Sequence, residues 1–186
     1  MLTPLPAEDW DDHARDALAA TVPPERRNPD DAGNALATLV RHPVLAGAFL
    51  PFNTYLQASS TLPERIRELV ILRTAHHHGC GYEWGHHSAM GRRSGLTEDD
   101  VDAARTGVAS DEFDQTVLNA VDELHSGSRI SPSTWARLGA CLDDKQRMDL
   151  MFTVGGYGTL ALALNTFDVE LEEGAGTDEF YATNPA

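Results

Sequence analysis

The twelve residues at positions 76–87, HHHGCGYEWGHH, bring together several chemically active side chains. Five of the chain's eight histidines lie here, with Cys80, Tyr82 and Glu83 among them. Imidazole, thiol and carboxylate groups at this density are typical of three kinds of site: a metal centre, a reactive thiol, or an acid–base pair. The spacing of the residues helps to choose between them.

A metal centre is the least favoured of the three. His76, His77 and His78 are adjacent, and successive side chains on a helix are rotated by about 100°, so these three cannot converge on one ion. The chain also lacks an H-E-x-x-H or C-x-x-C motif. The histidines are better explained as the polar end of a helix, where the helix dipole favours imidazolium. We therefore expect no bound metal.

Thiol chemistry would depend on Cys80, which stands at a predicted helix start. The helix dipole at such a position lowers the pKa of a thiol and favours the thiolate. A dithiol mechanism also needs a second cysteine nearby, but position 83 holds glutamate, and Cys141 is far along the chain. The alternative for a lone cysteine is a small buried apolar side chain.

Acid–base chemistry would depend on Glu83 and His87. Their spacing of four residues places them on the same face of a helix. There a carboxylate can hold one imidazole tautomer or share a proton with the ring, as general acid–base catalysis requires.

Arginine is concentrated around these histidines. Residues 61–95 hold five arginines and three glutamates, a local charge of +2 (5 − 3) in a chain of formal charge −15. Such a window suits an anionic ligand. The alternative is i, i+3 pairing on a solvated helix face, of Glu64 with Arg67 and of Arg65 with Glu68. That pairing would still leave Arg73 free to bind a substrate carboxylate.

The elements that must position these side chains are all predicted to be helices. The run LPERIRELVILRTAHHH begins with a proline suited to a first helical turn and is stopped by Gly79. A second helix is predicted from residues 80–82 to Gly95. Thr97, Ser110 and Ser131 are predicted N-caps of three further helices.

The remaining segments are also helical in pattern. Trp10, Ala14, Ala17 and Leu18 share one helix face. The last long helix is predicted to be interrupted at Gly155-Gly156. Because no stretch alternates with period two, we expect an all-α bundle of about eight helices and no sheet.

Composition limits the function. A chain of 186 residues, 41% hydrophobic and 23% charged, is typical of a soluble globular protein. Its charge of −15 argues against binding to nucleic acid or to an anionic membrane. The N-terminus, MLTPLPAEDWDDH, does not resemble a signal peptide, and the apolar stretch 154–167 is too short and glycine-rich to span a bilayer. We expect a cytoplasmic protein.

The run PERIRELVILRTAHHHGCGYEWGHHSAMGRRSGL resembles the core of the carboxymuconolactone decarboxylase and AhpD-like alkylhydroperoxidase superfamily. In the AhpD branch a C-x-x-C pair begins twelve residues after a glutamate, and a histidine follows the second cysteine by four residues. Glu68, Cys80 and His87 stand at three of these positions. Glu83 replaces the second cysteine, which is the peroxide-reacting thiol of that branch. The form YEWxxH is therefore more similar to the decarboxylase side of the superfamily.

The resemblance implies an all-helical subunit with an AhpD-like fold and no organic cofactor, which assembles into a homotrimer or homohexamer. It implies a site where the two motif helices meet. The domain boundaries that we predict are an N-terminal helical extension (1–42), a carboxymuconolactone decarboxylase-like core (43–125), C-terminal helices (126–172) and a polar tail (173–186).

The leading hypothesis is a cofactor-independent, decarboxylase-like enzyme that acts on a small organic acid or lactone, an anionic substrate. The predicted catalytic residues are Glu68, Glu83, His87 and Cys80, and the predicted substrate-binding residues are Arg73 and Tyr82. One alternative is an AhpD-like peroxidase that uses Cys80 alone. Another is a non-catalytic, oligomeric helical module that keeps the fold without the chemistry.

Overall fold

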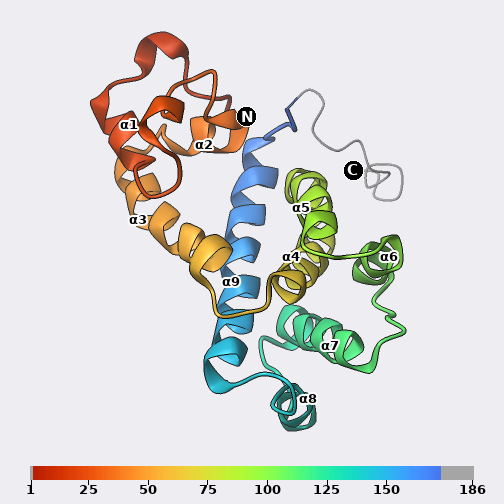
Figure 1. Cartoon of the computed structure of the whole chain (residues 1–186). Helices are drawn as coiled ribbons and strands as arrows, with labels where there is room; N and C mark the ends of the chain where they lie inside the picture. Colours follow the sequence, from red (N-terminus) through yellow and green to blue (C-terminus); the bar gives the residue numbers. More distant parts are fainter. Residues whose placement is uncertain (1, 173–186) are drawn as a thin grey trace.

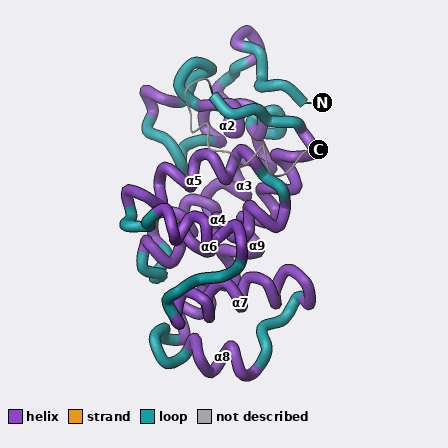
Figure 2. The backbone as a smooth tube through the Cα atoms, turned by 90° about the vertical axis from the view of Figure 1, so that its right-hand side faces the viewer, coloured by secondary structure: helices purple, strands orange, loops and turns teal. Residues whose placement is uncertain are grey.

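A computed structural model describes residues 2–172, and its regular secondary structure is helical throughout this range (Figure 1, Figure 2). The expected absence of a sheet is confirmed for these residues. Nine α-helices form where about eight were predicted: α1 (Asp12–Ala17), α2 (Gly33–Leu39), α3 (Pro43–Thr54), α4 (Glu64–His78), α5 (Gly81–Arg93), α6 (Glu98–Thr106), α7 (Glu112–Gly127), α8 (Pro132–Leu138) and α9 (Asp144–Phe167). The predicted polar tail, 173–186, lies outside the described residues.

Helix α4 is the central helix of the molecule, packed against α5, α6, α7 and α9 (Figure 1). All ten residues from 66 to 75 are buried, so no face of this segment is left to solvent. The buried stretch nevertheless contains charged side chains, and a buried charge is stable only when it is paired. Each charged residue of α4 must therefore find a partner on its own helix or a neighbouring one.

The turn between α4 and α5 forms as predicted. Gly79 adopts a left-handed conformation with φ of 61°, which glycine can occupy without a steric penalty from a Cβ atom. The amide of Cys80 donates to the carbonyl of Ala75 at 2.9 Å, which closes the end of α4. The chain then reverses, and α5 runs back along α4.

Helix α9 is continuous, contrary to the predicted interruption at Gly155-Gly156. The reason is that Gly156 serves packing and not chain reversal. A Cβ atom on Gly156 would lie 2.5 Å from Leu56 and 3.2 Å from Phe52. The missing side chain thus lets α9 pass close to α3 and to the π-helical segment Tyr55–Ser59.

By length and composition alone, α9 is apolar enough to cross a membrane, although the sequence predicted too short an apolar stretch. One face of the helix packs against α4 (Figure 1). Leu150, Tyr157, Ala161 and Leu164 on its inner face are buried. On its other side Met148, Phe152 and Leu162 are exposed, so α9 has one face on the core and one apolar face left open.

The N-terminal helices have a small core of their own. Trp10, Ala14, Ala17 and Leu18 are all buried, which confirms the predicted face. They pack with residues of α2 and α3 in a cluster separate from the one around α4.

Two of the three predicted helix N-caps are confirmed. Thr97 forms a capping box at the start of α6, and Ser131 caps α8. Helix α7, however, is capped by Asp111 and not by Ser110. The Asp111 carboxylate accepts from the amides of residues 113 and 114.

Arg65 shows how the charged residues of α4 are satisfied. Its guanidinium donates to both carboxylate oxygens of Asp114 on α7, at 2.8 and 2.6 Å, and lies 2.9 Å from Asp100 on α6. The predicted pairing of Arg65 with Glu68 is therefore wrong. Because α6 and α7 pack directly on α4, acids that are distant in sequence are closer than those one turn away.

Candidate active site

Glu68 and His87 form a buried pair at the contact between α4 and α5. The Oε2 atom of Glu68 lies 2.7 Å from Nδ1 of His87, and the two residues are 0% and 6% exposed. With Glu68 ionised, the Nδ1–H of His87 donates to it, which fixes the tautomer and the orientation of the ring. The two residues thus meet where the two motif helices pack together.

Arg67 completes this group on the other side of Glu68. Its Nε and Nη2 atoms both donate to Oε1 of Glu68, at 3.2 and 3.1 Å, and the predicted pairing of Arg67 with Glu64 does not form. Glu68 thus has a cation on one oxygen and an imidazole on the other. The Nη1 group of Arg67 forms no hydrogen bond with any residue between 2 and 172. That group remains available to a ligand.

Glu83 is buried without any such compensation. It is 2% exposed, and within the described chain neither carboxylate oxygen has a hydrogen-bond partner. Burial raises the pKa of Glu83 from 4.5 to about 8, and the nearby Cys80 thiol offsets only part of this effect. At neutral pH the side chain is therefore mainly a neutral carboxylic acid.

The predicted proton-sharing pair of Glu83 and His87 does not form as a hydrogen bond. Their spacing places both on the inner side of α5, as expected, but Nδ1 of His87 is bound to Glu68. The structure instead separates two functions. One carboxylate orients the imidazole, and a second, unpaired carboxyl lies one helical turn away.

Cys80 is the N-cap residue of α5 and is completely buried. It packs against Ala161 and Leu164 of α9. Burial, and after it the charge of Glu83, raises the pKa of the Cys80 thiol to about 12. The expectation that the helix dipole favours a thiolate is therefore wrong, because burial outweighs it. Cys80 and the exposed Cys141 are both free cysteines.

Tyr157 on α9 is a part of this site that sequence reasoning missed. Its ring stands edge-on to the ring of His87, with centroids 5.0 Å apart and an interplanar angle of 88°. The residue is 2% exposed, and burial together with the carboxylates of Glu68 and Glu83 raises the pKa of its hydroxyl. The only signal in the sequence was a tyrosine between glycines, which we interpreted as part of a break.

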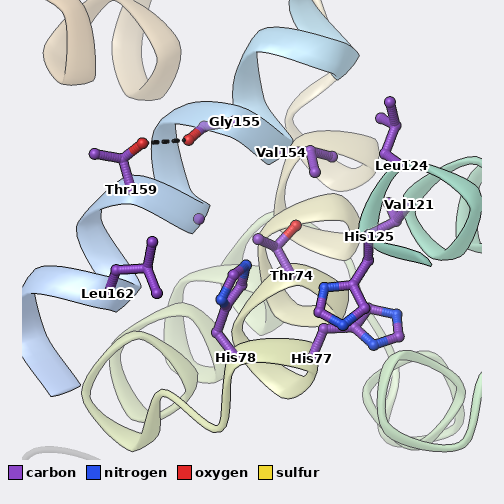
Figure 3. A pocket seen from close by; sticks show the side chains of 11 residues that line it. Thr74, His77, His78, Val121, Leu124, His125, Val154, Gly155, Thr159 and Leu162 are labelled. Atoms are coloured by element: carbon purple, nitrogen blue, oxygen red, sulfur yellow. Dashed lines mark hydrogen bonds between the residues drawn. The ribbon is translucent and has the colours of Figure 1, made fainter. Parts of the chain in front are cut away.

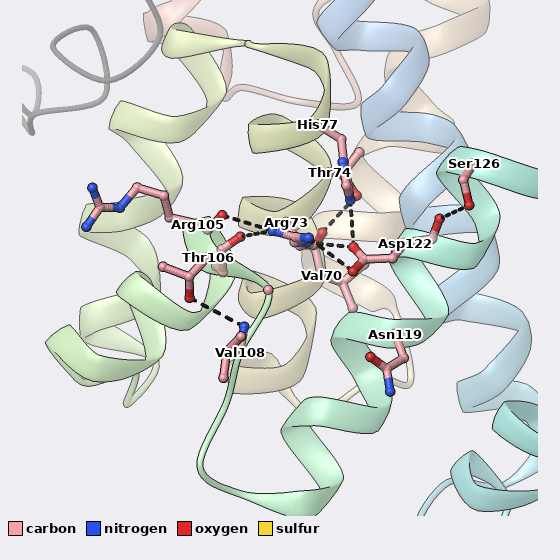
Figure 4. A network of polar contacts seen from close by, with 12 residues as sticks. Val70, Arg73, Thr74, His77, Arg105, Thr106, Val108, Asn119, Asp122 and Ser126 are labelled. Carbon is pink, nitrogen blue, oxygen red and sulfur yellow. Dashed lines mark hydrogen bonds and ion pairs between the residues drawn. The ribbon is translucent and has the colours of Figure 1, made fainter.

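Arg73 is not brought to this site. It lies five positions after Glu68, which at about 100° per residue turns its side chain roughly 140° away. Its guanidinium binds Asp122 of α7 at 2.6 and 3.0 Å and the carbonyls of Ala104 and Arg105 (Figure 4). With these partners Arg73 holds α4 against α6 and α7, so the predicted substrate-binding role is not supported.

Tyr82 is also engaged elsewhere. Its hydroxyl donates to Oε1 of Glu172 at 2.9 Å, and Nε2 of His86 lies 2.8 Å from Oε2 of the same carboxylate. The amide of Asn34 binds Glu172 as well, at 2.7 Å. Tyr82 and His86 thus fix the segment that follows α9 against α5.

The arrangement contains the elements of proton transfer. An oriented imidazole, an acid that stays neutral at pH 7 and an arginine with a free donor group come from α4 and α5, and a tyrosine closes the site from α9. Among residues 2–172, no three histidine, cysteine or acidic side chains are placed to hold a metal ion.

Comparisons with known proteins agree with this architecture. Residues 43–125 match the carboxymuconolactone decarboxylase family. No curated protein matches the chain significantly in sequence. Several solved structures share its fold, but their sequence identities are too low to indicate more than a common fold.

One of these structures is an alkylhydroperoxidase AhpD core, an uncharacterised peroxidase-related protein from Ralstonia eutropha JMP134. It has a TM-score of 0.73 and 17% identity, over 97% of this chain and 95% of the other. The debrominase Bmp8 has a TM-score of 0.71 and 18% identity, over 92% of each chain. A cysteine-to-alanine variant of Bmp8 in complex with 2,3,4-tribromopyrrole gives a TM-score of 0.69 at 17% identity, over 92% of this chain and 91% of the other. The fold is therefore the AhpD-like helical fold.

Proposed function

Because this chain belongs to the superfamily of carboxymuconolactone decarboxylases and AhpD-like proteins, we propose that it is a cofactor-independent enzyme. Its reaction is the decarboxylation of a small organic acid or lactone, or a closely related proton transfer. The observation that carries this proposal is the state of Glu83. A buried carboxyl with no partner among the described residues lowers stability. Such a group is typical of sites that need an acid at neutral pH.

Glu83 is the proton donor in this mechanism. Loss of CO2 breaks a carbon–carbon bond and leaves its electron pair on the substrate, delocalised into an adjacent unsaturated carbonyl. The carbanionic carbon then takes the proton of Glu83, and the resulting carboxylate regains a proton from solvent through His87. One proton is consumed for each CO2 released. No electron acceptor is needed, which is consistent with an enzyme that has no organic cofactor.

His87 and Glu68 act together in the second half of the cycle. Glu68 holds the imidazole by Nδ1, which leaves Nε2 to pass protons between solvent and Glu83. Tyr157 packs on the ring and excludes alternative orientations.

Arg67 replaces Arg73 as the residue that binds the anionic substrate. It belongs to the same buried group as Glu68, and its Nη1 group has no partner within residues 2–172. A guanidinium with a free edge suits a carboxylate or a polarised lactone carbonyl. The complex of the Bmp8 variant with 2,3,4-tribromopyrrole supports a small, planar ring compound as the kind of molecule that this fold accommodates.

Two alternatives have less support. A peroxidase mechanism would require a Cys80 thiolate, but the thiol has a pKa of about 12 and no second cysteine stands at position 83. A purely structural module would gain stability by replacing Glu83 with an apolar residue, because an unpaired acid adds nothing to its packing.

The test is a comparison of four glutamine variants. A thermal-shift screen of unsaturated lactone acids and aromatic-degradation acids identifies a ligand, and CO2 release from it is then measured. We expect His87→Gln and Glu83→Gln each to lower kcat/KM by about 10²–10⁴-fold, the usual effect of removing a general acid or base. His86→Gln and His77→Gln should do far less, because these side chains are bound to Glu172 and Asp122. Full activity in His87→Gln, or equal losses in all four variants, would remove the mechanism.

A further inference from the structure

A pocket lies between α4, α7 and α9, outside the group formed by Glu68, Glu83 and His87 (Figure 3). Its volume is about 280 Å³. This is enough for one six-membered ring with a substituent, since a cavity of about 150 Å³ already admits benzene. Three histidines line it, two of them from the run at 76–78 that the proposed mechanism does not use: His77, His78 and His125.

The remaining wall is mostly apolar. Val121 and Leu124 come from α7, and Val154 and Leu162 come from α9. Gly158 makes room for the ring of His78, because a Cβ atom at this position would lie 3.1 Å from Nε2 of that histidine. The pocket therefore has an apolar side that suits a ring and an imidazole side that suits a polar group (Figure 3).

The orientation of the histidines is not that of a metal site. The rings of His77 and His125 are stacked, with centroids 4.2 Å apart and an interplanar angle of 11°. His78 stands edge-on to His125, with centroids 5.5 Å apart. The nitrogen lone pairs of stacked rings lie in parallel planes and cannot converge on one ion. The rings instead offer separate N–H groups to a ligand.

The pocket lining offers an anion hydrogen-bond donors without an opposing carboxylate. Among residues 2–172 no acidic side chain lines the pocket, and the segment of α9 at 154–162 carries no charged residue. The carboxylate that contacts the histidines is Asp122, which lies 2.6 Å from Nε2 of His77. Asp122 is also held by Arg73 at 2.6 and 3.0 Å, so its charge is already compensated (Figure 4).

We propose that this pocket is a second binding site, which takes a small aromatic carboxylate. The ring lies between Val121, Leu124 and Val154, and the carboxylate accepts hydrogen bonds from His78 and His125. This site goes beyond the proposed decarboxylation, because none of its residues belongs to the acid–base group. A ligand here would contact α9 one residue after Tyr157, and it could thus adjust the position of the helix that closes the candidate active site.

Binding should depend on pH. Burial is the main cause that lowers the pKa of His77 and of His78, so both rings are largely neutral at pH 7. The titratable groups that face these two rings are Asp122 and His125 on α7 and Arg73 on α4. Residues 154–162 of α9, on the opposite wall, contain one titratable side chain, Tyr157, which points to His87. A bound carboxylate favours imidazolium, so binding takes up protons and becomes tighter as the pH falls.

The experiment uses sodium benzoate as the probe and the full-length protein. Histidine imidazole resonances are followed by NMR during titrations at pH 6 and pH 8. We expect benzoate to shift the resonances of His78 and His125 and to bind about tenfold more tightly at pH 6, because the uptake of one proton changes an affinity up to tenfold per pH unit. Benzyl alcohol, a neutral molecule of similar shape, should bind at least about tenfold more weakly, since it loses a charge-assisted hydrogen bond.

Variants identify the site. His125→Ala should weaken benzoate binding about tenfold or more, and this residue is exposed, so its replacement leaves the core intact. His78→Ala should act in the same direction, while His13→Ala, an exposed histidine of α1, should leave the affinity unchanged.

Three results would overturn the proposal. These are benzoate shifts at His87 in place of His78 and His125, equal affinity for benzoate and benzyl alcohol, and unchanged binding in both pocket variants. A failure of the decarboxylation proposal would look different. In that case CO2 release would be absent, while benzoate would still shift His78 and His125.

Discussion

Replacing Glu83 with glutamine should change how the free energy of unfolding depends on pH, whereas the same substitution at an exposed glutamate should not. Glutamine keeps the size of the side chain and removes its titration. The folded protein holds the Glu83 proton up to a pKa of about 8, whereas the unfolded chain releases it near 4.5. Between these values the folded state binds one more proton than the unfolded state. Stability contributed by this group is thus fully present below pH 4.5 and is lost as the pH rises toward 8.

The magnitude follows from the two pKa values. A difference of one bound proton changes the free energy of unfolding by about 1.4 kcal/mol per pH unit. From pH 5 to pH 8 this amounts to about 3–4 kcal/mol, because the slope diminishes as the folded state begins to ionise. That is a large part of the roughly 5–15 kcal/mol by which a typical domain is stable.

The assay is urea denaturation of the wild type and of Glu83→Gln at one-unit steps from pH 5 to pH 9. We expect the variant to gain stability relative to the wild type by about 3–4 kcal/mol between pH 5 and pH 8, with little further change above pH 8. Glu8→Gln, at an exposed position, is the matched control and should track the wild type. Parallel curves for the wild type and Glu83→Gln would refute the reasoning, because they would mean that Glu83 ionises normally in the folded protein.

Three further predictions concern the thiol, the assembly and the Arg73 anchor. Cys80→Ser should leave acid–base activity largely intact. With a thiol reductant present, the wild type and the variant should both consume alkyl hydroperoxides slowly. Fast consumption by the wild type that is lost in Cys80→Ser would favour the peroxidase alternative. Light scattering at micromolar concentration should show a homotrimer or homohexamer. Phe152→Asp should weaken this assembly, because the half-exposed Phe152 lines an apolar groove of about 440 Å³ together with Phe52. A wild-type monomer would contradict the prediction. Arg73→Met should lower the free energy of unfolding by about 2–4 kcal/mol in urea, because Asp122 keeps only His77 as a partner among the described residues and two carbonyls lose their donor. A loss below about 0.5 kcal/mol would mean that the anchor contributes little.

Local features of the sequence were sufficient to predict the boundaries of several helices, while the resemblance to the superfamily supplied Glu68, Cys80 and His87 as candidate site residues. The glycine stop after the histidine run and the caps at Thr97 and Ser131 depend on residues close to one another in sequence. Helix periodicity and capping chemistry act over these short distances, so a single sequence carries the necessary information.

The partners of buried charges could not be predicted in the same way. Arg73 appeared free because its partner, Asp122, is 49 residues away. Cys80 appeared reactive because its burial depends on α9, more than sixty residues later in the chain. Tyr157 was missed for the same reason. In each case tertiary packing set the charge state or the contact, and nothing in the neighbouring sequence indicates it.

The presence of two separate hydrophobic clusters has a consequence for how the protein opens. The N-terminal cluster around Trp10 and Leu18 contains few large side chains, whereas the cluster around α4 draws on α5 to α9. Cooperative units with less buried apolar area open at lower free energy than the rest of a fold. Amide hydrogens of α1 and α2 should therefore exchange with solvent through a partial opening that leaves α4 closed. Amides of α4 should exchange only when the whole molecule unfolds, so the acid–base group persists while the N-terminal helices open and close.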